Sequence, residues 1–242
     1  MSLLEYERPD ARIAVLRLNR PEVRNAMDRA LLAALEERLA ELAADEALGV
    51  LVISTTNTRA LCAGADVGEA LSAEEGVERM EAFARFYSAI EAFPAVTIAV
   101  ATGNCVGAGA ELVAGCDLRV GADNLKLAWA GARLGVPVGP ARLLPLVGMS
   151  VAKDLVFTGR VVGADEALRL ALLHRLTPEA EVEAAALELA QAVAANNGPG
   201  LRHLKRRFHA YADLAACVDD ENGELVAFQR EGGGLPQGGG RG

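Results

Sequence analysis

The chain has 242 residues, 52% of them hydrophobic, and a formal net charge of −9. A chain of this length and hydrophobicity can bury a large core, and its negative charge argues against nucleic acid or an anionic membrane as a general partner. No segment offers about 18 uninterrupted apolar residues, and Glu5, Glu7 and Arg8 place charges near the start. We therefore expect neither a signal peptide nor a membrane span.

Strand and helix patterns alternate through the first half of the chain. Residues 12–18, 49–54 and 95–101 are short β-branched runs that predict strands, the last two buried on both faces of a covered sheet. Asp28 can cap a helix with an apolar stripe of leucines, and residues 76–93 predict a second helix. The alternation predicts an α/β fold. The leucines of the stripe are Leu31, Leu32, Leu35, Leu39 and Leu42.

The second half is almost wholly helical from residue 150 onward. Breaks are expected near residues 158–159, 163, 177–178 and 196–199. This pattern predicts an α/β core over residues 1–145 and a helical region over residues 146–230. Residues 231–242 are so rich in glycine that we expect them to be disordered.

Several familiar catalytic and metal-binding patterns are absent. The sequence contains no GxSxG, HExxH or Walker motif, and His174, His203 and His209 lack metal-ligand spacing. Gly107-Ala-Gly109 follows a predicted strand, as in a dinucleotide-binding fingerprint, but Leu112 stands where the third glycine belongs. We therefore expect no metal and no nicotinamide cofactor. Four widely separated cysteines, with no CxxC pair, are typical of reduced thiols in a cytoplasmic protein.

Two turns of small residues point to a different chemistry. Residues 63–65 (Ala-Gly-Ala) and 107–109 (Gly-Ala-Gly) each follow a predicted strand. Amides at the start of a helix have no partner within the helix, and the helix dipole favours negative charge there. If the two turns meet at one end of the sheet, one amide from each can form an oxyanion hole.

Four segments resemble the enoyl-CoA hydratase/isomerase (crotonase) superfamily in order and spacing. They are "LNRPEVRNAM" (18–27), "LCAGADVGE" (61–69), "GAGAELVAGCDLRV" (107–120) and "FTGRVVGADEALRLALLHRL" (157–176). The resemblance implies a ClpP/crotonase-like spiral of ββα units with a helical C-terminal region, assembled as a homotrimer or homohexamer. It also implies an acyl-CoA substrate, with coenzyme A present only as part of the thioester and no permanently bound cofactor or metal.

The same resemblance assigns the site. It places the oxyanion-hole amides at Ala65 and at Ala108, where glycine is usual, and it aligns Glu111 with the first of two catalytic glutamates. The second glutamate falls on Gly131, where the family usually has a Pro-Glu pair and this chain has Ala130-Gly131. Glu111 would then be the single inherited acid/base; without the resemblance it would be an ordinary acid in the first turn of a helix.

Other positions are implied to contact the substrate or its coenzyme A portion. They are Arg24, Ala26, Ala63, Asp66, Val67, Gly68 and Gly107. Arg24 either lies near the phosphates or is solvated, and Gly68 replaces a frequent lysine. Asp66 and Asp117 are expected to be structural acids.

The C-terminal part departs from the family pattern. It lacks the segment that usually helps to cover the coenzyme A portion. The stretch "LRHLKRRFH" (201–209) either supplies cations for phosphates or is a solvated basic helix face, with Arg202, Lys205, Arg206 and Arg207 as its cations.

These residues favour an acyl-CoA-binding enzyme of fatty acid metabolism that stabilises an enolate. Enoyl-CoA hydration with Glu111 as the acid/base is the first expectation. Isomerisation, decarboxylation and thioester hydrolysis remain alternatives on the same fold. Two alternatives are not enzymes: a non-catalytic acyl-CoA carrier and an interaction module on an inactive scaffold.

Overall fold

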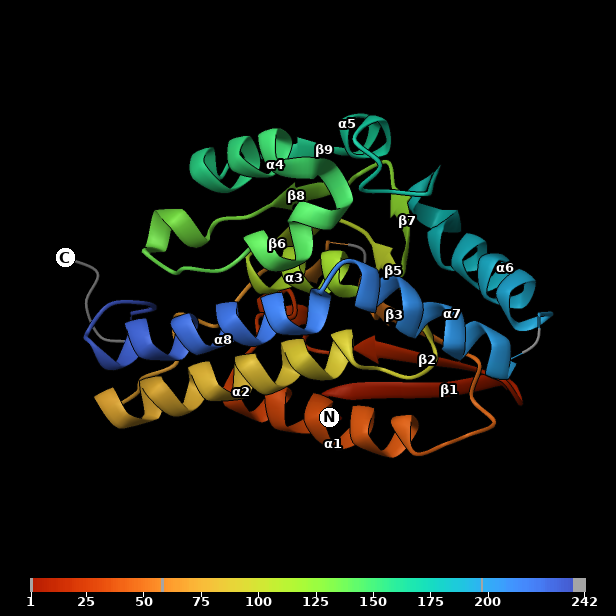
Figure 1. The fold of residues 1–242 in the computed structure, drawn as a ribbon, viewed down its shortest axis with the longest axis horizontal. Coiled ribbons are helices and arrows are strands. Elements are labelled where there is room, and N and C mark those ends of the chain that lie inside the picture. The colour runs from red at the N-terminus through yellow and green to blue at the C-terminus, as the bar shows by residue number, and fades with distance from the viewer. Residues whose placement is uncertain (1, 58, 197, 237–242) are drawn as a thin grey trace.

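The computed structural model describes residues 2–57, 59–196 and 198–236. Its main sheet has six strands in the order β1-β2-β3-β5-β7-β10, parallel except for the β1–β2 pair (Figure 1). A second sheet has the order β4-β6-β8-β9. The main-sheet strands are β1 (Leu4–Asp10), β2 (Ile13–Leu18), β3 (Val50–Thr55), β5 (Val96–Ala101), β7 (Leu118–Ala122) and β10 (Arg175–Thr177). Those of the second sheet are β4 (Ala60–Cys62), β6 (Asn104–Val106), β8 (Lys126–Ala128) and β9 (Val162–Gly163).

Successive strand pairs divide between the two sheets. Strands β3, β5 and β7 join the main sheet, and the next strand of each pair, β4, β6 and β8, joins the second sheet. Helix α2 (Ala73–Glu91) follows the first pair and α3 (Ala108–Gly115) follows the second. This repeat is a spiral of ββα units, and the predicted α/β crotonase fold is confirmed.

Alternation along the strands sorts side chains into two cores. Leu16, Leu51 and Ile53 face the core that includes α1 (Arg29–Ala43), α2 and α3. Val15 and Val52 face the opposite core, which α6 (Val182–Ala194) covers. Both faces of the main sheet are therefore buried, as expected for a mostly parallel sheet.

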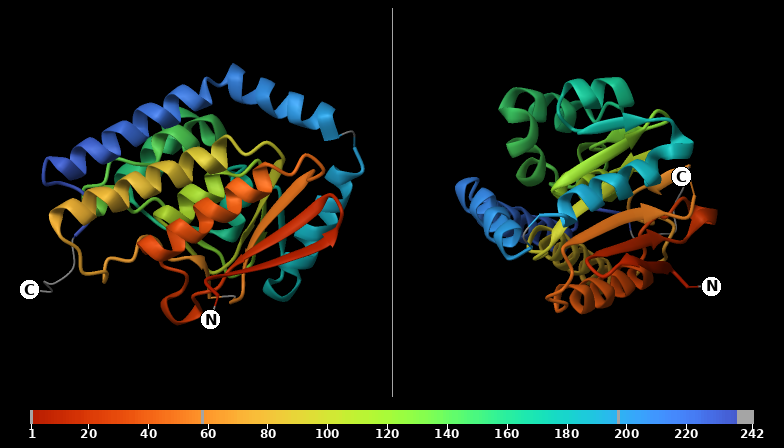
Figure 2. Two further views of the ribbon diagram at one scale, coloured as in Figure 1. Left: turned by 90° about the horizontal axis from the view of Figure 1, so that it is seen from below. Right: turned by 90° about the vertical axis from the view of Figure 1, so that its right-hand side faces the viewer.

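Caps fix the first two long helices. The Asp28 carboxylate accepts a hydrogen bond from Leu31 N at 2.8 Å, which confirms the predicted start of α1. Ser72 and Glu75 form a reciprocal capping box at the start of α2, so this helix begins three residues before the predicted range. Figure 2 shows α1 and α2 side by side, with α8 (Leu214–Arg230) lying along α2.

The C-terminal half is mostly helical, as the sequence predicts. Helix α4 (Pro140–Thr158) bends at Gly148 and ends at a predicted break, with Gly159 as its C-cap. The other helices are α5 (Ala164–Arg169) and α7 (Gly198–Tyr211), with short 3-10 helices at Pro21–Val23, Gly131–Leu134 and Glu179–Glu181. Because α4 runs across residue 145 and β10 joins the main sheet, the proposed division at residues 145/146 stays a prediction.

The predicted disorder of the glycine-rich residues 231–242 stays a prediction. Residues 231–236 turn back after α8, and Leu235 is buried against the core. The side chain of Gln229 bonds the backbone of Leu235, which compensates for the small apolar area of this segment. Residues 237–242, the rest of the predicted tail, lie outside the described residues.

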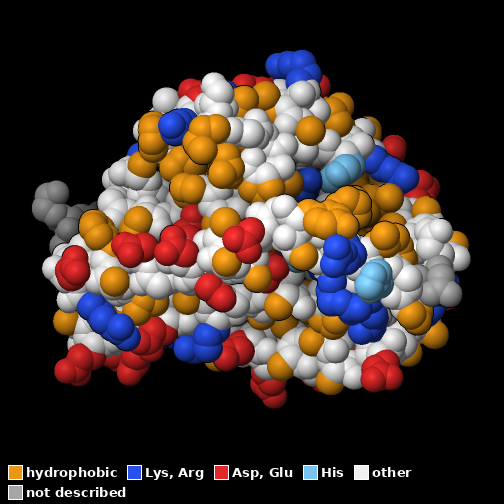
Figure 3. All heavy atoms as spheres, in the orientation of Figure 1, with side chains coloured by type: hydrophobic (Ala, Val, Ile, Leu, Met, Phe, Trp, Pro, Cys, Tyr) orange, Lys and Arg blue, Asp and Glu red, His pale blue; other side chains and the backbone are white. Residues whose placement is uncertain are grey.

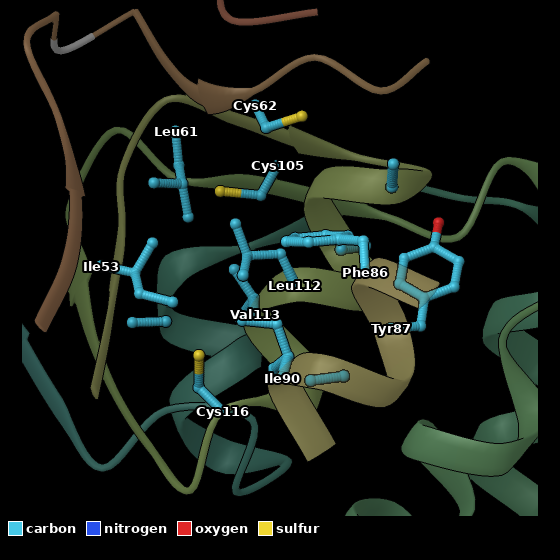
Figure 4. Close-up of a cluster of buried hydrophobic side chains, with 14 of the residues drawn as sticks. Ile53, Leu61, Cys62, Phe86, Tyr87, Ile90, Cys105, Leu112, Val113 and Cys116 are labelled. Atoms are coloured by element: carbon cyan, nitrogen blue, oxygen red, sulfur yellow. The ribbon is translucent and has the colours of Figure 1, made fainter. Parts of the chain in front are cut away.

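The ends of α2 and α3 meet the second sheet in an apolar cluster. Figure 4 shows Phe86, Leu112 and Val113 packed below Cys62 and Cys105, with Tyr87 at the edge of the group. Burial raises the pKa of the Cys62 thiol to about 12. Across the described ranges, no helix has the length and hydrophobicity to cross a bilayer, and no three His, Cys, Asp or Glu side chains are grouped as a metal site.

Candidate active site

The two small-residue turns meet, as expected for an oxyanion hole. A Cβ atom added at Gly109 would lie 2.1 Å from the carbonyl oxygen of Cys62, so α3 can approach β4 only with glycine there. Gly64 has φ of +112°, and a Cβ added to it would lie 3.1 Å from Val106 O. Glycine is thus required on both sides of the contact, once for close packing and once for backbone conformation.

Backbone hydrogen bonds fix the orientation of both turns. Met27 N donates to Gly64 O at 2.8 Å, and Asp66 N donates to Met27 O at 2.9 Å. These bonds leave the amide of Ala65 between them without a protein acceptor within the described residues. The amide of Ala108, the first residue of α3, likewise has no protein acceptor within the described residues. Both are donors that a ligand can use.

Ala65 and Ala108 line the same cavity, which has a volume of about 210 Å³. We call it the site cavity. Its described wall contains no charged side chain and only one polar one, the hydroxyl of Tyr87. The larger side chains of the wall are Val67, Met80, Phe83, Tyr87, Val106, Leu134, Val136, Val138, Leu225 and Leu235. Two amide donors at the edge of an apolar cavity suit a ligand with one carbonyl group and an apolar tail.

Glu111 lies on the first turn of α3 and is only 1% exposed. Its Oε2 accepts a hydrogen bond from Arg142 Nε at 2.8 Å, and its Oε1 has no partner among the described residues. Burial raises the pKa of Glu111 to about 7, opposed by the nearby Arg142 charge. The described wall of the site cavity does not include Glu111. The predicted acid is therefore close to the site in sequence but is engaged with an arginine.

Arg142 holds two carboxylates at once. Its Nη2 donates to Glu221 Oε1 at 2.7 Å, and its guanidinium stacks 4.4 Å from the ring centre of Tyr87. The other oxygen of Glu221 accepts from Gly139 N and Ala141 N at the start of α4. The triad Glu111–Arg142–Glu221 thus ties α3, α4 and α8 together behind the site cavity.

Gly131 lines the site cavity but has no room for a larger residue. A Cβ at this position would lie 2.7 Å from Val136 O and 3.3 Å from a methyl group of Val138. A glutamate at the family position would therefore require the 131–138 loop to move. Both the residue type and the backbone of this loop therefore exclude a second acid at residue 131.

The implied substrate positions divide between the cavity and its rim. Ala63, Val67 and Gly107 line the site cavity, and Gly68 is exposed beside them. Arg24 is exposed, and its carbonyl accepts a hydrogen bond from Ala63 N at 3.0 Å. Ala26 is half-buried in the same turn. The Asp66 carboxylate accepts hydrogen bonds from Gly68 N and Arg20, in agreement with a structural acid.

The four cations of the basic stretch on α7 lie in two different environments. Lys205 is buried and bonds Asp117 at 2.7 Å, and Arg202 donates to the carbonyl oxygens of residues 45, 46 and 48. Of these four cations, only Arg206 and Arg207 are exposed. Figure 3 shows Lys and Arg side chains gathered over α7 and acidic ones over α8. Arg202 and Lys205 therefore hold α7 against the core.

Sequence reasoning missed Arg142, Glu221 and Leu235. Arg142 has no charged neighbour in the sequence that marks it as a partner of Glu111, which lies 31 residues earlier. Glu221 lies in an acidic run on α8 that reads as a solvated face. An arginine in an otherwise apolar segment, residues 134–147, was the one available signal.

Comparison with known proteins agrees with this architecture. The chain matches the family described as "Enoyl-CoA hydratase/isomerase" over residues 8–230. It is 33% identical over 178 residues to the crotonyl-CoA hydratase of Syntrophomonas wolfei, covering 72% of this chain and 68% of that protein. It is 31% identical over 207 residues to the 2,3-dehydroadipyl-CoA hydratase of Escherichia coli K12, covering 84% and 81%. The crystal structure of an enoyl-CoA hydratase from Bacillus anthracis superposes with a TM-score of 0.84 at 26% identity, covering 93% and 91%.

The spiral of ββα units and the two converging turns define a protein of the crotonase class. The chain belongs to the enoyl-CoA hydratase/isomerase family, as its sequence motifs predict. The family match and the hydratase relatives support crotonase-type chemistry on acyl-CoA thioesters as its general activity.

Proposed function

We propose that the protein binds an acyl-CoA thioester with its carbonyl oxygen between the amides of Ala65 and Ala108. The observation that carries this proposal is that Ala65 and Ala108, whose amides have no acceptor within the described residues, line the same apolar cavity. Amide donors aimed at the oxygen stabilise the enolate that forms when the α-carbon loses a proton or the β-carbon gains a nucleophile. Removing one such donor costs on the order of 10²–10³ in rate.

Enoyl-CoA hydration, with Glu111 as the single acid/base, is the reaction we propose. A carboxyl group with a pKa near neutrality is well matched to proton transfer at physiological pH. To act on a bound thioester, Glu111 must hold a water molecule beside the site cavity, and its unpartnered Oε1 can accept that water while Oε2 stays bonded to Arg142. The names of the two hydratases similar to this chain support hydration over the other crotonase reactions.

A non-catalytic acyl-CoA carrier is the second candidate. It is favoured by the buried bond between Glu111 and Arg142 and by the lack of space for a second acid at Gly131. In a carrier, the two amides would hold the thioester and Glu111 would serve only the triad.

Calorimetry and a turnover screen test the proposal. Crotonyl-CoA is expected to bind at least about tenfold more tightly than crotonate plus free coenzyme A, because only the thioester joins both parts of the ligand in one molecule. Equal affinities in folded protein would overturn thioester binding. Turnover of a panel of acyl-CoA thioesters, followed by mass spectrometry, then separates the enzyme from the carrier.

We further propose a cytoplasmic homotrimer or homohexamer. The feature that supports the assembly is the apolar groove between α4 and α8, which has a volume of about 850 Å³.

A further inference from the structure

The end of the described chain forms a wall of the site cavity. Residues 231–236, which we call the strap, turn back from the end of α8. Gly232 and Gly234 have φ of +90° and +82°, a conformation that favours glycine. Gly233 N donates to Phe228 O at 3.0 Å, and a Cβ at Gly233 would lie 2.3 Å from the Phe228 ring. The glycine run thus makes a tight turn packed directly on α8.

Two buried side chains hold the strap in place. Gln229 accepts a hydrogen bond from Leu235 N at 3.0 Å and donates to Leu235 O at 3.4 Å. Arg79, which is fully buried, donates from Nη2 to Pro236 O at 3.0 Å. Its Nη1 donates to Asp66 O at 3.3 Å, next to the Ala65 amide. One arginine therefore connects the strap with the turn that carries half of the oxyanion hole.

The position of Leu235 follows from these contacts. Its side chain is buried and lines the site cavity together with Leu225, Met80 and Phe83. Leu235 comes from the strap, whereas the other three come from the long helices α2 and α8. Its truncation would enlarge the cavity without changing a residue of these long helices.

We propose that Leu235 is a specificity-determining residue that limits the length of the acyl group. This inference rests on the proposed function and adds its substrate class, CoA thioesters of short, apolar acyl groups. An apolar cavity of about 150 Å³ accommodates benzene, so a cavity of about 210 Å³ takes an acyl group of roughly four to eight carbon atoms. A terminal carboxylate on the acyl group would be buried without a partner among the described wall residues, which is unfavourable.

The test measures binding of saturated thioesters, so that no turnover interferes. Wild-type protein is expected to bind butyryl-CoA and octanoyl-CoA about tenfold or more tightly than dodecanoyl-CoA by calorimetry. Leu235→Ala is expected to raise the affinity for dodecanoyl-CoA by about tenfold, the effect of roughly two newly buried methylenes. Affinity for butyryl-CoA is expected to stay within about twofold, because the short chain does not reach Leu235.

A second variant covers the case in which Leu235→Ala does not fold. Leu235→Trp is expected to lose octanoyl-CoA binding and to keep butyryl-CoA binding. Phe208→Ala, at an exposed position on α7 outside the cavity wall, serves as the control and should show the wild-type profile. Identical chain-length profiles for the wild type and both Leu235 variants would overturn the inference and leave the proposed function standing. If no thioester binds better than coenzyme A alone, the proposed function itself fails.

Discussion

Glu111 combines a helix first-turn position with almost complete burial, and this combination distinguishes it from a solvated acid. Glu111→Gln retains size and shape, and the amide oxygen can still accept the bond from Arg142. The variant is expected to fold and to bind crotonyl-CoA like the wild type, while hydration falls by about 10²–10⁴. Steady-state kinetics and calorimetry on the same samples check this, with the exposed Glu188→Gln on α6 as the control. Equal turnover in Glu111→Gln and wild type would contradict an acid/base role.

The raised pKa of Glu111 gives a second, independent readout. If its ionised form activates water, the rate of hydration should increase as the pH rises through about 7. The free energy of unfolding should instead fall as the pH rises. The folded protein holds this proton more tightly than the unfolded chain, whose carboxyl has the ordinary pKa of 4.5. The stabilisation that protonated Glu111 contributes is complete below pH 4.5 and is lost as the pH rises to about 7. Urea unfolding between pH 4.5 and 7 should show a larger loss of stability with rising pH in wild type than in Glu111→Gln.

Among the elements, the close contact between α3 and β4 positions the amide of Ala108, which we propose as one donor of the oxyanion hole. Gly109→Ala places a methyl group against the carbonyl of Cys62, a backbone atom that cannot rotate away. We expect the free energy of unfolding to fall by about 3 kcal/mol, because α3 must move outward. Acyl-CoA affinity should fall with it, since Ala108 moves with the helix.

A matched glycine substitution separates this clash from a general effect of adding a methyl group. Gly223 lies inside α8, and an added Cβ there would meet no atom within 4 Å. Gly223→Ala is expected to stabilise the protein by about 0.5–1 kcal/mol through its helix propensity. Denaturant unfolding of both variants provides the comparison; similar stability changes would refute the close-contact explanation for Gly109.

Helix α7 is attached to the core by a cluster of charges. The Asp117 carboxylate accepts a bond from Lys205, and His209 lies between Glu91, at 2.9 Å, and Asp117, at 3.5 Å. Hydrogen bonds to Asp117 and Glu91 raise the pKa of His209 to about 9, while burial and Lys205 oppose the shift. Asp117 thus has the structural role that its sequence position indicates.

The His209 cluster makes part of the stability dependent on pH. Because the folded pKa of His209 lies above the unfolded value of 6.5, its contribution is complete below about pH 6.5 and is lost as the pH rises through about 9. We expect a loss on the order of 1–2 kcal/mol in this window. His209→Gln should remove this part of the pH dependence, measured by urea unfolding at pH 6, 8 and 9.5. A variant with the same pH dependence as wild type would show that the charge of His209 does not hold α7.

Sequence patterns predicted elements better than they predicted contacts between elements. β2, β3, β5 and α1 were visible because β-branched runs, one leucine stripe and a capping Asp28 are local signals. The meeting of the two turns followed from their shared place after strands. The bond between Glu111 and Arg142 could not be predicted, because it depends on how α4 packs on α3. The contacts of the strap could not be predicted either, since they are made with Gln229 and Arg79, which lie on other elements.

At the scale of the whole molecule, an apolar surface on α4 remains without a partner in the single chain. Leu144, Met149 and Phe157 on this helix are exposed, and Phe157 is 73% exposed. Leu144 and Phe157 line the apolar groove between α4 and α8. Exposed apolar patches of this kind commonly mark protein interfaces. The surface agrees with self-association, which the family resemblance also implies.

Phe157→Glu tests both the assembly and the location of the site. Light scattering of the wild type is expected to give three or six times the 25.3 kDa mass of one chain. The variant should shift toward the monomer, because a charge at the centre of an apolar contact is left without a partner. Tyr211→Glu, at an equally exposed position on α7, should leave the assembly unchanged.

The affinity of monomeric Phe157→Glu for butyryl-CoA then decides whether subunits share the site. The site cavity and both amides belong to one chain, but Arg206 and Arg207 are cations without a carboxylate bond in the same chain, within the part that the structure describes. If a neighbouring subunit supplies such cations to the coenzyme A phosphates, the monomer should bind about tenfold or more weakly and with less dependence on salt. A monomer that binds butyryl-CoA as tightly as the assembly, with the same salt dependence, would place the whole binding site within one chain.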